Sequence, residues 1–292
     1  MSLRSQLGGT GVALITPFTK TGAVDFNALG KVINYVLDGG VNYLVTLGTT
    51  GETPTIDKQE KFDIIHYTYE KVNNRVPIVV GIGGNNTKEL INDLEQYPLD
   101  KAVAVLSASP YYSKPSQEGL FQHDKANASP KPILLYNVPG RTGRNLAAST
   151  TIRLANEVAN IAGIKEASDD MNQAMQILRD RPESFLVVSG DDALILPQLV
   201  CGMDGVISVA ANSFPKDFAA MIQFGLNNNF EAARKLHYKL LEAYDLLFVE
   251  NNPAGVKGFL YEMGLIENEL RLPVTPLSNA TQQKVKAFLA QL

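Results

Sequence analysis

Short apolar runs rich in β-branched residues recur along the chain, and between them lie longer stretches with apolar residues on one helical face. Continuous apolar strands, as opposed to alternating ones, are typical of parallel sheets whose two faces are both covered by helices. Eight strand–helix units in about 220 residues predict a closed (β/α)8 TIM barrel. The expected strands span residues 11–15, 43–47, 77–81, 102–106, 132–136, 161–165, 185–188 and 205–209.

The helical stretches between these strands carry recognisable N-terminal signals. Asp57 is followed three residues later by Glu60, which predicts a capping box, and Ser149 precedes an amphipathic run. The expected helices span residues 25–37, 57–72, 87–95, 117–126, 149–158 and 171–179, and beyond the last strand only helical patterns remain, at 229–249, 255–263 and 281–289. We therefore expect a barrel domain over residues 1–224 and a helical extension over residues 225–292 that packs on it.

Composition narrows the class of protein. The 292 residues carry a formal net charge of −4, and the 26 lysines and arginines are scattered, which argues against nucleic acid as a partner. The single cysteine, Cys201, excludes an intramolecular disulfide and a cysteine-built zinc site, and we expect it to be a small core residue. No apolar stretch approaches the roughly 18 residues of a membrane span, and residues 1–5 lead into no signal core, so we expect a cytoplasmic protein without a membrane partner.

Lys165 closes the apolar run 161–165, which predicts a buried lysine at the carboxyl end of a strand. Burial lowers the pKa of a lysine, and a neutral amine is a nucleophile toward ketones, so Schiff-base chemistry is the first hypothesis. The alternative is a structural lysine that extends into solvent or pairs with Glu166. Because neighbouring side chains on a strand point to opposite faces, Glu166 is a poor counter-ion for Lys165.

Other polar residues close neighbouring strands and are expected to share the mouth of the barrel with Lys165. Thr49 and Thr50 lie in a glycine-flanked turn that can bind a carboxylate, although they equally suit a simple turn. Tyr136 ends the fifth strand and is a candidate proton donor and acceptor, or a packing residue. Arg141 offers a planar fork for a carboxylate, or is an ordinary exposed loop arginine.

Three further signals are weak. The segment 81–86 has two glycines at dinucleotide-motif spacing but lacks the third, so we interpret it as a loop after the third strand. The three histidines are far apart and have no ligand at metal-site spacing, and we expect no metal site. Asp191 and Asp192 are better explained as a strand-to-helix turn with a capping aspartate than as a cation site.

Several motifs occur in order at the ends of the expected strands, and with them the chain resembles the dihydrodipicolinate synthase family almost from end to end. The motifs are Gly48-Thr49-Thr50-Gly51-Glu52, Pro110-Tyr111-Tyr112, Tyr136-Asn137-Val138-Pro139-Gly140-Arg141-Thr142-Gly143, Gly163-Ile164-Lys165-Glu166-Ala167, Ser189-Gly190-Asp191-Asp192, Gly205-Val206-Ile207-Ser208-Val209 and Phe248-Val249-Glu250-Asn251-Asn252-Pro253.

The resemblance implies a class I aldolase-type lyase that condenses pyruvate with L-aspartate 4-semialdehyde to 4-hydroxy-tetrahydrodipicolinate, in the diaminopimelate route to lysine, with no metal or organic cofactor. It also implies roles by position: Lys165 for the imine, Tyr136, Thr49 and Tyr112 for a proton relay, Thr50 for the pyruvate carboxylate, Arg141 for the semialdehyde carboxylate, and Gly190 and Ile207 for backbone contacts near the keto acid.

The resemblance further implies a homotetramer, a dimer of tight dimers, in which Tyr112 reaches into the neighbouring site. Asn85, Glu89 and Tyr111 match parts of the family's lysine-inhibitor pocket, whereas Lys58 and Lys61 stand where lysine-regulated relatives carry histidines. Two added ammonium groups repel a cationic effector, so we expect weak or absent inhibition by lysine. Gly140 replaces a serine frequent in the family, and we expect activity to survive this change.

Two alternatives remain at this level. A sialate or 2-keto-3-deoxy-sugar-acid aldolase of the same superfamily would share Lys165 and Tyr136, but its neutral sugar chain gives Arg141 no carboxylate to bind. A non-catalytic barrel that binds a small carboxylate would keep Thr50 and Arg141 and would not need a reactive amine.

Overall fold

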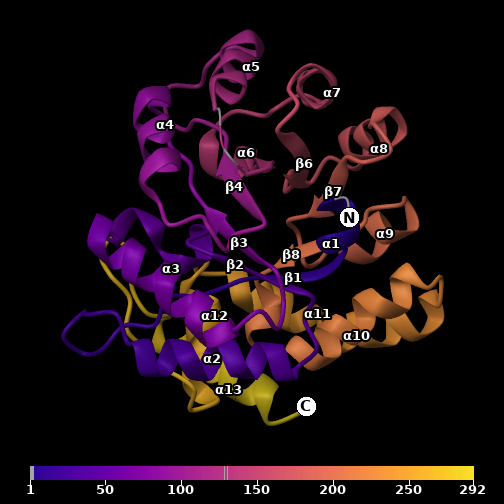
Figure 1. The fold of residues 1–292 in the computed structure, drawn as a ribbon. Helices are drawn as coiled ribbons and strands as arrows, with labels where there is room; N and C mark the ends of the chain where they lie inside the picture. Colours follow the sequence, from indigo (N-terminus) through magenta and orange to yellow (C-terminus); the bar gives the residue numbers. More distant parts are fainter. Residues whose placement is uncertain (1–2, 128, 130) are drawn as a thin grey trace.

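Eight parallel strands form a closed barrel in which each strand pairs with the next and β8 pairs with β1. The computed structural model describes residues 3–127, 129 and 131–292. Figure 1 shows the strands at the centre, ringed by helices, which confirms the predicted (β/α)8 barrel. The strands are β1 (Gly9–Ala13), β2 (Tyr43–Thr46), β3 (Ile78–Gly81), β4 (Ala104–Ala108), β5 (Ile133–Asn137), β6 (Ile161–Glu166), β7 (Leu186–Ser189) and β8 (Gly205–Ser208).

The predicted helices of the barrel are present, with additions. The expectation that Ser149 caps its helix is wrong, because that helix already begins at Ala148, after Ala147, which makes no side-chain cap hydrogen bond. Asp57 and Glu60 form the predicted capping box at the start of α3. The helices are α1 (Leu3–Gln6), α2 (Phe26–Asp38), α3 (Lys58–Val72), α4 (Thr87–Gln96), α5 (Gln117–Ala126), α6 (Pro139–Thr142), α7 (Ala148–Glu157), α8 (Met171–Asp180), α9 (Ile195–Val200) and α10 (Pro215–Leu226).

Four of these helices, α1, α6, α9 and α10, escaped the sequence analysis. The first three have four to six residues each, too few for a helical period to stand out. Helix α10 is apolar around much of its circumference because it packs between β1, α2 and α11, so its polar face is narrow. Strand limits differ from the prediction by up to two residues, since the ladder hydrogen bonds and not the apolar run set where a strand ends.

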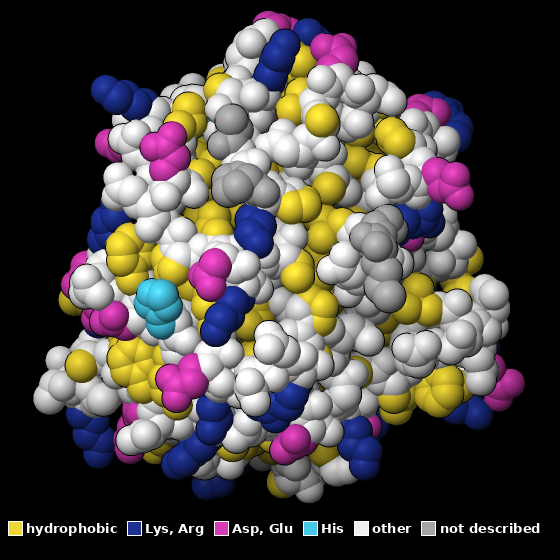
Figure 2. Space-filling view, viewed as in Figure 1, with side chains coloured by type: hydrophobic (Ala, Val, Ile, Leu, Met, Phe, Trp, Pro, Cys, Tyr) yellow, Lys and Arg dark blue, Asp and Glu magenta, His cyan; other side chains and the backbone are white. Residues whose placement is uncertain are grey.

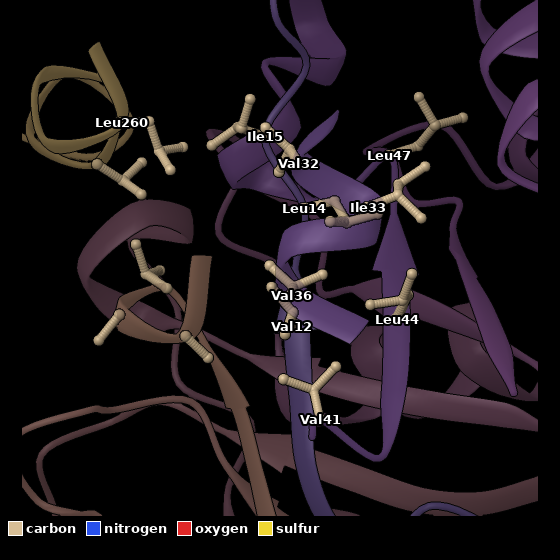
Figure 3. Close-up of a cluster of buried hydrophobic side chains, with 14 of the residues drawn as sticks. Val12, Leu14, Ile15, Val32, Ile33, Val36, Val41, Leu44, Leu47 and Leu260 are labelled. Atoms are coloured by element: carbon tan, nitrogen blue, oxygen red, sulfur yellow. The ribbon is translucent and has the colours of Figure 1, made fainter. Parts of the chain in front are cut away.

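The core has an inner layer within the barrel and an outer layer between strands and helices. The inner layer includes Val45, Val79 and Leu134 from three strands. Figure 3 shows part of the outer layer, where Val12 of β1 lies against the apolar face of α2 at Val36. Because each strand is covered on both sides, the rigid barrel fixes the direction of every side chain at its carboxyl ends.

The C-terminal helices α11 (Phe230–Phe248), α12 (Ala254–Glu262) and α13 (Asn279–Leu289) pack against the barrel. Phe214, at the N-cap of α10, makes edge contacts with Phe259 of α12 and Phe288 of α13, with ring centroids 5.2 and 6.0 Å apart. The boundary proposed between residues 224 and 225 falls inside α10, which ends at Leu226. Since the cluster spans both parts, we propose that 225–292 is an integral layer of the fold.

The face shown in Figure 2 carries charges of both signs without a large patch of either. Among the described residues, no helix is long and apolar enough to cross a membrane. The expectation that Cys201 is a core residue is wrong. It caps the carboxyl end of α9 and is partly exposed, because it lies in the turn between α9 and β8.

Candidate active site

Lys165 and Tyr136 lie side by side at the carboxyl end of the barrel. They are partners in the register of β5 and β6. The Lys165 side chain is 5 % exposed, and its Nζ lies 4.3 Å from the centroid of the Tyr136 ring. The expected juxtaposition of a buried amine and a phenol therefore exists within one chain.

A cavity of about 420 Å³ opens above this pair. Its walls come from the ends of β2, β5, β6, β7 and β8 and from the chain between α11 and α12. The lining residues are Thr49, Thr50, Tyr136, Val138, Gly140, Arg141, Lys165, Ala167, Gly190, Asp191, Val209, Phe248, Asn251 and Asn252. The volume suits small polar substrates more than a bulky ligand.

Glu166 does not pair with Lys165. Its carboxylate points the other way and accepts hydrogen bonds from Asn137 Nδ2 at 3.0 Å, Gln173 Nε2 at 3.0 Å and the backbone N–H of Ser168 at 2.8 Å. Burial raises the pKa of Glu166, and these hydrogen bonds oppose the shift. The interpretation of Lys165 as half of a Lys165–Glu166 pair is therefore wrong, because the strand pleat sends the two side chains to opposite faces.

The threonine turn follows β2 as the 3-10 turn η1 (Thr49–Gly51). Thr50 is 2 % exposed, and its Oγ1 accepts a hydrogen bond of 3.0 Å from Asn252 Nδ2. Gly51 O accepts a 2.8 Å hydrogen bond from Thr16 Oγ1. The turn is thus held on one side by Thr16 and on the other by Asn252 of the C-terminal extension, and Thr50 lies at the cavity.

Arg141 lies in the short helix α6 at the rim of the cavity. Its Nη2 donates to Asn251 Oδ1 at 3.1 Å and to Asn252 O at 3.4 Å. These contacts orient the guanidinium through Nη2 and use only part of its planar fork. A carboxylate that enters the cavity can meet that fork side-on.

Gly190 and Ile207, expected together near the keto acid, occupy different positions. Gly190 lines the cavity, and a Cβ at this residue would lie 2.7 Å from Lys165 Cε. Ile207 is fully buried in the barrel interior and is not among the lining residues, whereas Val209, just after β8, does line the cavity. Of these two residues, only Gly190 has atoms that line the cavity.

Tyr112 is not brought to the cavity within one chain. Its side chain is 89 % exposed and its backbone is left-handed, with φ of 67°. The neighbouring Tyr111 is 48 % exposed. A left-handed tyrosine is uncommon, and it projects the ring away from its own barrel.

The residues expected for an inhibitor pocket separate into two groups. A second cavity of about 390 Å³ shares Thr49 and Tyr136 with the first, and Tyr111 and Lys61 line it. Lys58, Asn85 and Glu89 are exposed and do not line this cavity, and Lys58 Nζ lies 3.5 Å from Asp93 Oδ1. Because Lys58 has this carboxylate beside it, the expected repulsion of a cation falls mainly to Lys61.

The acidic pair after β7 has structural roles. Asp191 Oδ1 accepts from the N–H groups of Ala193 and Leu194, and the buried Asp192 accepts from those of Val209 and Ala210. Burial raises the pKa of Asp192 to about 6. Among the described residues there is no group of three metal-ligating side chains.

Sequence reasoning assigned no role to the segment between α11 and α12. Asn251 and Asn252 of this segment line the cavity together with Phe248, the last residue of α11, and Asn252 contacts Thr50. They come from some 200 residues further along the chain. The Asn251-Asn252-Pro253 motif was the available signal, but only the packing of the extension brings it to the site.

The fold and cavity define a (β/α)8 barrel with one buried lysine beside a tyrosine at its catalytic end, which is the arrangement of an imine-forming lyase or aldolase. A family model described as the dihydrodipicolinate synthetase family matches residues 6–292. The chain belongs to this family.

Relatives support the same assignment. A protein of Parabacteroides distasonis named 4-hydroxy-tetrahydrodipicolinate synthase is 47 % identical, over 98 % of this chain and 97 % of its own. The solved dihydrodipicolinate synthase of Thermotoga maritima has a TM-score of 0.95 at 39 % identity, with 98 % of each chain covered. That of Acinetobacter baumannii, solved in complex with pyruvate, has a TM-score of 0.94 at 38 % identity, over 97 % of this chain and 98 % of its own.

Proposed function

We propose that this protein is a 4-hydroxy-tetrahydrodipicolinate synthase, a lyase that condenses pyruvate with L-aspartate 4-semialdehyde in the diaminopimelate route to lysine. The observation that carries the proposal is the buried amine of Lys165, which lines the cavity 4.3 Å from the ring of Tyr136. A sensor that only binds a carboxylate has no use for an amine in that position.

The chemistry begins with addition of the Lys165 amine to the ketone carbon of pyruvate and loss of water, which forms a protonated imine. The iminium withdraws electrons, so a methyl proton leaves and an enamine forms. The enamine carbon attacks the aldehyde of the second substrate, and the aldehyde oxygen takes up a proton. The amino group of that substrate then adds to the imine carbon, displaces Lys165 and closes the six-membered ring.

The surrounding residues bind the substrates and move protons. Thr50 and the backbone at Gly190 hold the pyruvate carboxylate and keto group, with Ile207 contributing through its backbone from below. Arg141 binds the semialdehyde carboxylate through the part of its fork that Asn251 does not use. Tyr136 and Thr49 carry protons between the imine and the incoming aldehyde.

Tyr112 completes the relay from a second subunit. Its exposed, left-handed position in the single chain suits a ring that inserts into a neighbouring cavity. The assembly is a homotetramer built from two such dimers, and it works in the cytoplasm. Lysine inhibits it weakly or not at all.

The test is reductive trapping followed by a substrate panel. Incubation with pyruvate and borohydride adds one reduced pyruvate, and digestion with mass spectrometry locates it. We expect modification of Lys165, none in Lys165→Ala, and unchanged modification in Lys239→Ala, which removes an exposed lysine of α11 that pairs with Asp217 of α10. A coupled assay then compares aspartate semialdehyde with N-acetylneuraminate.

Turnover of aspartate semialdehyde with trapping at Lys165 supports the proposal. Trapping combined with cleavage of N-acetylneuraminate alone would assign the chain to the sialate branch. Absence of trapping from a folded protein would leave the carboxylate-binding barrel as the function.

A further inference from the structure

A buried ion pair connects the C-terminal extension to the threonine turn. Lys257 of α12 is fully buried, and its ammonium lies against Glu52 Oε1, while Glu52 itself is 3 % exposed. Lys257 Nζ also donates to Glu269 O at 2.9 Å and lies 4.1 Å from the centroid of the Phe18 ring. A buried ion pair is poor evidence of added stability, because desolvation of both charges opposes their attraction. Its position therefore calls for a different explanation.

Glu52 is the residue that ends the threonine turn. Its backbone is left-handed, with φ of 56°, and its N–H donates to Thr49 O at 3.1 Å. A glutamate in this conformation is strained and persists only where its surroundings hold it. The surroundings are the C-terminal extension, since Glu52 Oε2 also accepts a 3.0 Å hydrogen bond from the N–H of Arg271.

We propose that the Lys257–Glu52 ion pair positions the Thr49–Gly51 turn for the substrate keto acid, so that the C-terminal extension sets the affinity for pyruvate. The inference rests on the proposed function, in which Thr50 binds the pyruvate carboxylate. Lys257 touches no substrate and is a positioning residue.

A second set of contacts holds the chain just after the turn and makes the effect local. The Arg271 guanidinium donates to both oxygens of Glu60 and, at 2.8 Å, to Thr55 O. These contacts fix the start of α3 independently of Lys257. Loss of Lys257 therefore loosens residues 49–52 while the helix after them stays in place.

The two partners differ in how well the fold tolerates their loss. Burial lowers the pKa of Lys257 to about 8, although the charge of Glu52 opposes this shift. Glu52→Gln leaves an amine that can release its proton at little cost. Lys257→Met leaves a buried carboxylate with no cation beside it, and is the more severe change.

The mostly buried ion pair of Arg181 and Asp204 supplies a control at the opposite end of the barrel. These two side chains are 9 % and 10 % exposed, against 0 % and 2 % for Lys257 and Glu52, and Asp204 Oδ1 also lies 2.8 Å from Arg4 Nε. Asp204 accepts from the N–H of Val187, at the amino end of β7, far from the threonine turn along that strand. Arg181→Met removes one cation from a carboxylate, as Lys257→Met does, but it leaves Arg4 beside Asp204 and does not touch the cavity.

The experiment measures kcat, the pyruvate KM and the thermal midpoint of four folded variants: Lys257→Met, Glu52→Gln, the double variant and Arg181→Met. We expect the pyruvate KM to rise about tenfold in Lys257→Met and roughly threefold in Glu52→Gln, with kcat changed much less, because ground-state positioning is lost. The pyruvate KM of the double variant, which leaves no unpaired charge, should lie between those of wild type and Lys257→Met. Arg181→Met lowers the midpoint and keeps the wild-type pyruvate KM.

A folded Lys257→Met with an unchanged pyruvate KM would overturn the inference, as would an equal rise of KM in Arg181→Met. If Lys257→Met does not fold, Glu52→Gln decides by the same measure. Failure of the proposed function looks different, since the wild-type protein itself would then neither turn over nor trap pyruvate at Lys165, and the inference would fall with it.

Discussion

Gly190→Ala is the most direct test of how tightly the cavity holds Lys165. Gly190 lies at the end of β7, and its N–H donates to Glu166 O at 2.7 Å, so its backbone cannot easily move aside. A Cβ here would lie 2.7 Å from Lys165 Cε and 2.5 Å from Ala167 Cβ. Carbon atoms in contact normally lie about 3.5 to 4.0 Å apart. The lysine stem must therefore retreat by roughly 1 Å to admit one methyl group.

The expected cost follows from that displacement. A reactive group moved by about 1 Å costs on the order of 100-fold in rate, or roughly 2.7 kcal/mol of transition-state stabilisation. Overpacking the site also destabilises the fold by about 1 to 3 kcal/mol, which lowers Tm by several degrees. The loss of activity should thus be much larger than the loss that a smaller fraction of folded protein would cause.

The assay compares the rate of pyruvate trapping by borohydride in Gly190→Ala and Gly84→Ala, at a temperature where both are folded. Nothing lies within 4 Å of a Cβ at Gly84, so this control adds the same methyl to open space and should trap at the wild-type rate. A wild-type trapping rate in Gly190→Ala would refute the steric reasoning and the placement of Lys165 on which it depends.

Three other predictions concern different parts of the molecule. Arg141→Lys should raise the KM for aspartate semialdehyde by roughly tenfold or more and leave pyruvate trapping unchanged, since a lysine offers no planar fork; an unchanged KM would exclude this role. Burial raises the pKa of Asp124 to about 7, above its value in the unfolded chain. The free energy of unfolding is therefore not reduced by this residue at low pH, and the reduction grows as pH rises toward 7. In denaturant unfolding, the free energy of unfolding of Asp124→Asn minus that of wild type should therefore increase by about 2 kcal/mol from pH 5 to pH 8. A difference that does not change with pH would contradict the burial argument. Micromolar L-lysine should leave the rate nearly unchanged, and Lys61→Ala should strengthen inhibition more than Lys58→Ala, because Lys58 is already close to Asp93; strong inhibition of the wild type would show the reasoning to be wrong.

Local sequence patterns were sufficient to identify the barrel and its most reactive end. Apolar runs at regular spacing mark strands buried on both faces, and a lysine at the end of such a run is conspicuous because buried charges are rare. The pleat alone indicated that Glu166 would face away from Lys165, and its carboxylate does face Asn137 and Gln173.

Other features depend on contacts between distant parts of the chain, which no local pattern encodes. Tyr136 and Thr49 approach Lys165 because the barrel closes with a particular register. Asn252 reaches Thr50 from 202 positions away, and Lys257 reaches Glu52 from the same extension. The clash that makes Gly190 necessary is likewise visible only when β6 and β7 lie side by side.

The chain's own pattern of apolar and polar residues thus specifies strands, helices and the chemical type of the site, because these depend on burial and short-range periodicity. Which groups meet, which charges are paired and which surfaces stay open follow from long-range packing, where a shift of one residue in register exchanges one face for the other. Tyr112 illustrates the difference, since no local pattern indicates that its backbone is left-handed or that its side chain is 89 % exposed in the single chain.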